Sequence, residues 1–189
     1  MCVPQNVVQL EQALFQIFAQ HNQSQALLFD ALVESREVTI DMDLSGLPAS
    51  KNAEGSSKGY FSKRRGTYGR QLARIIVPET QEIVAESLYP GNRLSLEVFK
   101  EMVVKMEMAL NLEAKEQKQS IRLRLDGGFG TDENINFALW RGYEILAKMF
   151  SGKRARKSSR LSLLLLSSPS NNGLMYPAQL LMAPGKLDG

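Results

Sequence analysis

IRLRLDGGFGTDENI, residues 121–135, decides how this sequence is interpreted. Apolar Ile121, Leu123 and Leu125 alternate with charged side chains, which is the period of a strand with one buried face. The alternation ends at Asp126, directly before a glycine-rich turn and the start of a helix. An acidic side chain is therefore expected at the carboxyl end of a strand.

A second strand with the same ending is predicted from residue 37 to residue 43. Its apolar side chains alternate with Thr39, Asp41 and Asp43. Open α/β sheets place their active crevices at the carboxyl ends of their strands, so Asp43 and Asp126 are expected side by side. Asp41 lies roughly 6.6 Å back along the strand, so it is expected behind the site unless its role is exchanged with that of Asp43.

Hydrophobic periodicity predicts a helical segment at residues 1–35, followed by the order β-β-β-α-β-α-β. A strand-helix-strand crossover gives parallel neighbours, so a mixed sheet is expected, with the first strand pairing with both the following hairpin and the strand at 121–126. The remaining elements are strands at 71–77 and 82–88, a helix at 95–112 capped by Ser95, a helix at 131–141 and a strand at 143–148.

The composition excludes several classes of protein. The hydrophobic fraction of 43% and the charged fraction of 23% are those of an ordinary soluble domain. Cys2 is the only cysteine and His21 the only histidine, which argues against disulfides, cysteine-built zinc sites and histidine-based nucleophilic catalysis. The longest apolar run, Leu163–Leu166, is too short to span a bilayer, so a soluble, cytoplasmic protein without membrane contact is expected.

A basic segment follows the first strand. Glycines, serines and bases in residues 45–68 favour a long loop, and residues 58–74 contain no acid. Lysines and arginines beside aromatic side chains suit phosphate contacts and stacking on bases, although a solvated surface loop is the alternative. The side chains concerned are Lys58, Lys63, Arg64, Arg65, Arg70 and Arg74, with Tyr60, Phe61 and Tyr68.

Two carboxylates at neighbouring strand ends form half of a divalent-metal site. Mg²⁺ prefers oxygen ligands, and two ions about 4 Å apart can activate a nucleophile and stabilise a leaving oxygen in phosphoryl transfer. The alternative is that Asp43 and Asp126 each end a strand and face water. The spacing of glycines 127, 128 and 130 matches neither the Walker loop nor the dinucleotide-binding fingerprint. A tight turn capped by Thr131 is therefore favoured over a nucleotide-binding loop.

Three segments together resemble the Asp-Asp-Glu transposases of bacterial insertion sequences. They are DMDLSGLP at 41–48, EGSSKGYFSKRRGTYGRQL at 54–72 and IRLRLDGGFGTDENINFALWRGYEILAK at 121–148. The resemblance spans residues 37–156 and implies a ribonuclease H-like fold. In that family two aspartates and a glutamate bind two Mg²⁺ or Mn²⁺ ions, which direct water and then a DNA 3′-hydroxyl against phosphodiester bonds.

On this resemblance Asp43 is the first catalytic, metal-binding residue and Asp126 the second. Insertion-sequence ends would be the DNA partner, with a homodimer assembled on them. The residues expected to contact the DNA backbone are Lys58, Lys63, Arg64, Arg65 and Arg70.

The third carboxylate of the family is not found in the C-terminal sequence. Beyond Lys157 there is no glutamate, and Asp188 is the only acid. We therefore expect a partial ribonuclease H-like domain at 36–157 and an irregular, poorly ordered tail at 158–189, as an interrupted or frameshifted reading frame would produce. DNA cleavage is then impaired. A non-catalytic nucleic-acid-binding module using residues 58–74 is the alternative from a different class.

Overall fold

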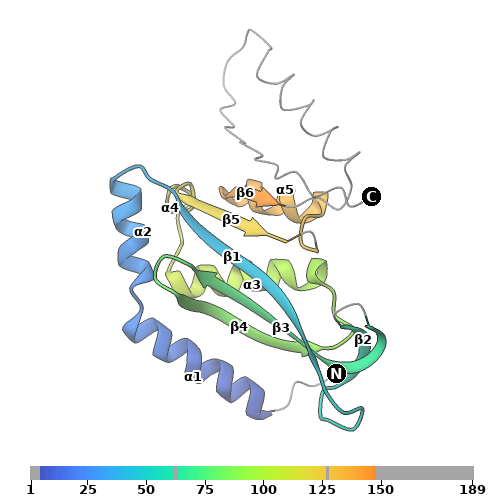
Figure 1. Cartoon of the computed structure of the whole chain (residues 1–189). Helices are drawn as coiled ribbons and strands as arrows, with labels where there is room; N and C mark the ends of the chain where they lie inside the picture. Colours follow the sequence, from blue (N-terminus) through green and yellow to red (C-terminus); the bar gives the residue numbers. More distant parts are fainter. Residues whose placement is uncertain (1–4, 62–63, 127, 148–189) are drawn as a thin grey trace.

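The computed structural model describes residues 5–61, 64–126 and 128–147 (Figure 1). The predicted order β-β-β-α-β-α-β is present, with an additional strand β2 and a short helix α4. The predicted tail at 158–189 and the end of the predicted domain at 148–157 lie outside the described residues. The elements are α1 (Gln5–His21), α2 (Ser24–Val33), β1 (Val38–Pro48), β2 (Ser57–Phe61), β3 (Arg64–Val77), β4 (Glu82–Pro90), α3 (Ser95–Leu110), α4 (Lys115–Lys118), β5 (Ile121–Leu125), α5 (Asp132–Arg141) and β6 (Glu144–Ala147).

A curled mixed sheet organises these elements around β1. Strand β1 pairs antiparallel with β3 and parallel with β5, as predicted from the sequence. Strand β6 extends the parallel side by pairing with β5. On the other side, β3 pairs with β4 along its second half and with β2 along its first half.

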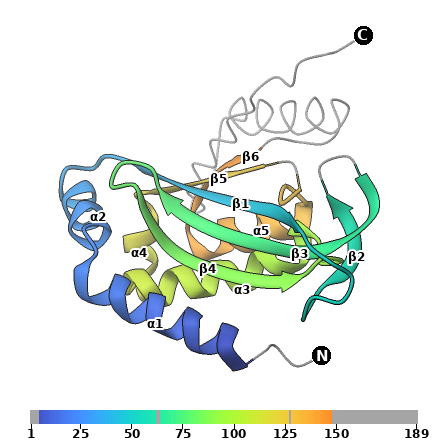
Figure 2. The same ribbon diagram turned by 60° about the horizontal axis from the view of Figure 1, so that its bottom comes forward.

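Helices α3 and α5 cover one face of the sheet (Figure 2). Alternating residues of β1, β3, β5 and β6 point into this core, because a strand turns successive side chains to opposite faces. Phe99, Met102 and Met106 form a core stripe on α3, since all three are fully buried. The opposite face of the sheet carries the charged members of each alternation and is not covered by any helix of the described residues.

The prediction of a long loop at residues 45–68 is wrong. Strand β1 continues to Pro48, β2 occupies Ser57–Phe61, and β3 begins at Arg64. Two of the glycines taken as signs of a loop, Gly46 and Gly59, instead make room for close packing around Phe61, whose side chain is 1% exposed. A Cβ on Gly46 would lie 2.6 Å from the Phe61 ring, and one on Gly59 would lie 3.3 Å from it.

Ser95 does not cap α3 as predicted. It is the first helical residue, and Leu94 occupies the N-cap position. The carboxylate of Glu97 accepts the backbone N–H of Leu94 at 3.0 Å, which satisfies one of the free donors at this helix start. The predicted end near residue 112 is confirmed to within two residues, and Asn111 terminates the helix in the left-handed conformation.

Candidate functional site

Asp43 lies on β1, and Asp126 directly follows β5, the strand parallel to β1. The pairing of β1 with β5 ends at Met42 and Leu125, and each aspartate is the next residue along the chain. Met42 and Leu125 are buried, and the residues that follow them, Asp43 and Asp126, are exposed. The parallel pairing agrees with the expectation that the two aspartates are neighbours, which stays a prediction, as does the role of the two carboxylates as metal ligands.

Asp43 has a basic neighbour on its other side. Its cross-strand partner on β3 is Arg74, whose Nε donates to Oε2 of Glu86 at 2.7 Å. The hydroxyl of Ser45 donates to Oδ2 of Asp43 at 2.7 Å. Glu86, Arg74 and Asp43 therefore lie in one row across β4, β3 and β1, which places a guanidinium next to Asp43.

Asp41 is held by a different partner. It lies opposite Arg124 in the β1–β5 register, and the guanidinium of Arg124 donates to Oδ2 of Asp41. The hydrogen bond that Arg124 donates to Asp41 raises the pKa of Arg124 above its ordinary value, against a smaller opposing effect of burial. The other oxygen of Asp41, Oδ1, is buried without a hydrogen-bond partner in the described part of the chain. Asp41 therefore lies behind the candidate site, two residues before Asp43 on the same strand.

The glycine-rich turn after Asp126 packs tightly. A Cβ on Gly128 would lie 2.6 Å from the Ser95 hydroxyl, so a side chain at this position would displace the start of α3. Phe129 is buried and donates its N–H to the carbonyl of Asp126 at 3.0 Å. The predicted cap is confirmed, since Oγ1 of Thr131 accepts the N–H of Asn134 at 3.2 Å. These contacts fit a structural turn, while Gly127 lies outside the described residues.

The basic side chains lie on strands instead of a loop. Lys58 is exposed on β2 directly opposite Tyr68 on β3, and Arg70 follows two residues later. Tyr68, Arg70 and Arg74 occupy alternate positions of β3, so they share the face that carries Asp43. Lys63 lies outside the described residues, and only the backbone of Arg64 and Arg65 is described, at the start of β3.

Arg74 is the side chain that sequence reasoning missed at this face. The sequence identified it within the acid-free segment but did not place it at the site. The two-residue period of a strand would have placed Arg74 on the same face as Arg70. Only the register with Asp43 shows that it adjoins the aspartates.

Arg141 and Tyr143, which contributed to the resemblance, serve a buried cluster at the other end of the parallel strands. Nε of Arg141 donates to Oε1 of Glu107 at 2.8 Å, and the Tyr143 hydroxyl donates to the same oxygen at 2.9 Å. Nζ of Lys118 lies 3.1 Å from it. The cluster ties α3 to α4 and α5 immediately before β5 and β6 begin, so its role is structural.

The described residues contain no group of three or more histidine, cysteine or acidic side chains arranged to hold a metal ion. Asp43 and Asp126 supply two oxygen ligands of the kind that Mg²⁺ and Mn²⁺ prefer. Nothing in the described helices is long and apolar enough to cross a bilayer.

The chain was compared with protein families, curated proteins and solved structures. No protein-family model matches the chain. No curated protein matches it either. Among solved structures, it is similar to a piggyBac transposase in a synaptic complex with hairpin DNA, with 14% sequence identity and a TM-score of 0.45. The match covers 72% of this chain and 27% of that chain.

Proposed function

We propose that this chain is part of a DNA transposase with a ribonuclease H-like, Asp-Asp-Glu domain, and that Asp43 and Asp126 provide two of its metal ligands. The observation that supports the proposal is the parallel β1–β5 register, which ends one residue before Asp43 on β1 and one residue before Asp126 after β5. Bound Mg²⁺ or Mn²⁺ would supply the activation of water and of a DNA 3′-hydroxyl. The residues of the chain hold and orient the substrate.

The basic side of the same face supports DNA as the substrate. Arg74, Arg70 and Tyr68 follow one another along β3 away from Asp43, over about 20 Å at the rise of a strand. Lys58 adjoins Tyr68 at the far end. Cations at intervals with one exposed aromatic ring suit a nucleic-acid backbone that ends at the aspartates.

We further propose that the chain by itself cleaves DNA weakly. The family chemistry requires a third carboxylate, and the sequence from 158 to 189 offers Asp188 alone. Metal and DNA binding depend on residues that are present, so they should survive. A plasmid-nicking assay with Mn²⁺ tests this. Robust nicking that Asp126→Asn abolishes would contradict the proposed impairment and still support the family.

Metal binding provides the first test of the site. Asp43→Asn and Asp126→Asn should each weaken Mn²⁺ binding at least about tenfold, because loss of an outer-shell partner alone costs 10–100-fold. Electron paramagnetic resonance of free Mn²⁺ measures the affinity. Asp41→Asn is the matched control and should leave the affinity nearly unchanged, since Asp41 is engaged by Arg124. An equal loss of Mn²⁺ affinity in all three variants would contradict the choice of Asp43 over Asp41 as the metal ligand.

A non-catalytic nucleic-acid-binding module is the second candidate, favoured by the basic face of β3 alone. The two functions differ in how DNA affinity responds to Mg²⁺. Affinity that rises with Mg²⁺ and falls in the Asp43→Ala and Asp126→Ala variants supports the transposase site. A DNA affinity that changes neither with Mg²⁺ nor in the Asp43→Ala and Asp126→Ala variants supports the binding module.

A further inference from the structure

Arg74 lies between two carboxylates on the face of the sheet that no helix of the described residues covers. Its cross-strand neighbour on β1 is Asp43, and its cross-strand neighbour on β4 is Glu86. Side chains opposite one another in an antiparallel pair have Cβ atoms about 4.5–5.5 Å apart, so the guanidinium can reach either carboxylate. In the structure Nε of Arg74 donates to Oε2 of Glu86 at 2.7 Å. Arg74 is therefore paired with Glu86 and not with Asp43.

Asp43 has no guanidinium partner as a result. Among the described residues its hydrogen bond comes from the hydroxyl of Ser45, which donates to Oδ2 at 2.7 Å, and no ion pair joins it to Arg74. Asp41, two residues earlier on the same strand, shows the other arrangement, because the guanidinium of Arg124 donates to it. A carboxylate oxygen that accepts a guanidinium hydrogen bond has fewer lone pairs for a metal ion. Of the two acids on β1, Asp43 is therefore the one kept available.

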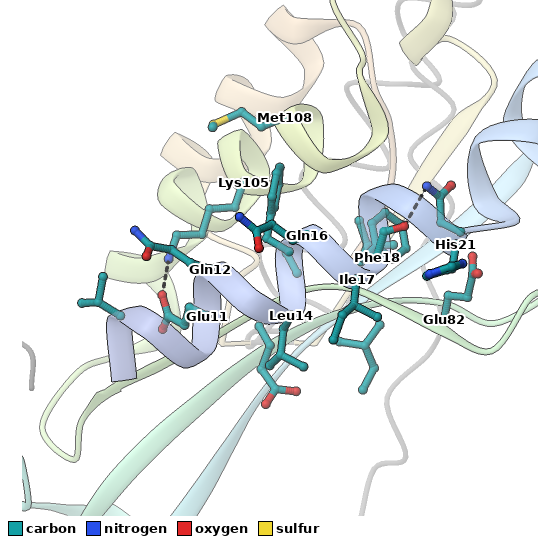
Figure 3. Close-up of a pocket in the computed structure, with 17 residues that line it drawn as sticks. Glu11, Gln12, Leu14, Gln16, Ile17, Phe18, His21, Glu82, Lys105 and Met108 are labelled. Carbon is teal, nitrogen blue, oxygen red and sulfur yellow. Dashed lines mark hydrogen bonds and ion pairs between the residues drawn. The ribbon is translucent and has the colours of Figure 1, made fainter. Parts of the chain in front are cut away.

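Arg74 is the only cation that pairs with Glu86 in the described part of the chain. Glu86 also lines a groove of ≈ 950 Å³ along α1, in which Lys105 is the one lysine or arginine among the described lining residues (Figure 3). Lys105 is already engaged, since its Nζ lies 3.3 Å from the carboxylate of Glu11 and 3.3 Å from that of Glu101. Glu86 and Arg74 therefore depend on one another for charge compensation.

Glu86 can influence the candidate site through Arg74 without touching a metal ion. We propose that Glu86 is a positioning residue that holds Arg74 away from Asp43, so that the Asp43 carboxylate is available as a metal ligand. The inference rests on the proposed function, because its effect reaches the metal only through Asp43. Glu86 engages Nε of Arg74, so the Nη groups of the guanidinium have no partner among the described residues and can contact a DNA phosphate.

Manganese affinity, measured by electron paramagnetic resonance, tests the inference in the wild type, Glu86→Gln, Arg74→Gln and the double variant. Glu86→Gln should weaken Mn²⁺ binding at least about tenfold, the loss expected when a residue that orients a metal site is removed, because Arg74 then pairs with Asp43. In the double variant no guanidinium remains, so its Mn²⁺ affinity should return to that of Arg74→Gln. A loss on Glu86→Gln that is the same with and without Arg74 would show that Glu86 acts through its own charge, and would overturn the proposal.

Glu79→Gln is the matched control. It removes the same charge from the turn that precedes β4, where Glu79 pairs with Arg36, and should leave the Mn²⁺ affinity unchanged. Circular dichroism on each variant establishes that it is folded.

The Asp43→Asn variant separates failure of the inference from failure of the proposed function. If Asp43→Asn weakens Mn²⁺ binding and Glu86→Gln does not, the metal site stands and the role of Glu86 is refuted. If Asp43→Asn has no effect on Mn²⁺ binding, both are wrong.

A measurement without metal follows the guanidinium itself. The Nε–H signal of Arg74 in ¹⁵N nuclear magnetic resonance is identified by its absence in Arg74→Gln. It should shift in Glu86→Gln and shift again when Asp43→Asn is added, because the guanidinium then loses its second carboxylate as well. A signal that does not respond to Asp43→Asn in the Glu86→Gln background shows that Arg74 does not turn to Asp43, and overturns the proposal.

Discussion

Glu107 is a buried carboxylate at the centre of a cluster of charged and polar side chains. It is 7% exposed, and its carboxylate receives three cationic or hydroxyl donors, from Arg141, Lys118 and Tyr143. Burial alone would raise its pKa, but the hydrogen bonds from these donors lower the pKa below its ordinary value of 4.5. Burial raises the pKa of Tyr143 far above its ordinary value, and the neighbouring carboxylate raises it further.

Glu107→Gln should therefore destabilise the protein strongly at neutral pH. The substitution keeps the shape but leaves Arg141 and Lys118 near one another without their anion, which costs about 3–5 kcal/mol in buried pairs. Urea unfolding measures the change. Glu133→Gln, which removes an exposed ion pair with Lys100, is the control and should change stability little.

The stability of the wild type and that of the Glu107→Gln variant should depend differently on pH. Because the folded-state pKa of Glu107 is depressed, its ionised form stabilises the fold above pH 4.5, and this contribution is lost as the pH falls through the folded-state value. The stability difference between wild type and Glu107→Gln should thus shrink as the pH is lowered below about 4.5. A difference that is constant with pH would show that Glu107 stabilises the fold without its charge.

At the scale of elements, alternation and crossover rules predicted most of the sheet. Strands β1 and β5 were predictable because each alternates cleanly, with one buried and one charged face. The same rules could not find β2 or the first half of β3, because four of the glycines there and nearby serve close packing instead of turns. Gly46, Gly59, Gly69 and Gly91 leave no room for a Cβ beside Phe61 or a neighbouring backbone.

Gly69→Ala should test this packing. Its Cβ would lie 2.3 Å from the carbonyl oxygen of Leu47, so β1 and β3 would have to separate at this point. We expect a loss of about 1–3 kcal/mol in the free energy of unfolding, as for other overpacked sites. Amide hydrogen exchange should show the loss first in β2. Thr67→Ala on the same strand is the control, and equal effects of both substitutions would contradict the close approach.

The candidate site was predictable only in part for a related reason. The expectation that the two aspartates are neighbours rests on two strand ends and one crossover, all readable from the sequence, and the parallel pairing of β1 with β5 agrees with it. The placement of Arg74 beside Asp43 depends on the antiparallel register, which is set by pairing along the whole of β3. The engagement of Asp41 by Arg124 likewise depends on which residues face one another across β1 and β5.

At the scale of the whole molecule, charge is divided between two regions. The helices α1 and α2 contain no lysine or arginine, whereas Lys58, Arg70 and Arg74 lie on one sheet face. Figure 1 shows α4 and β2 at opposite ends of the sheet, so a basic residue of α4 can serve as a control for this face. On the proposed function, a DNA duplex is therefore expected to bind along β3 and not along α1, which has no cationic side chain.

The salt dependence of DNA binding should report this division. Replacing Lys58, Arg70 and Arg74 together with Gln should flatten the slope of log affinity against log salt by about 2.7, at about 0.9 for each phosphate that is no longer neutralised. Fluorescence anisotropy at several salt concentrations measures the slope. Lys115→Gln on α4 should leave it unchanged. An unchanged slope in the triple variant would place the DNA elsewhere.

The central position of β1 also sets the order in which the protein can assemble. Strand β1 pairs with β3 through residues close in sequence, but with β5 through Asp41 and Arg124, which are 83 residues apart. Contacts between such distant segments form late, because the intervening chain must first be ordered. During synthesis the half containing β1, β3 and β4 can fold before Asp126 has been translated. The proposed site at Asp43 and Asp126 would then be completed only late in folding.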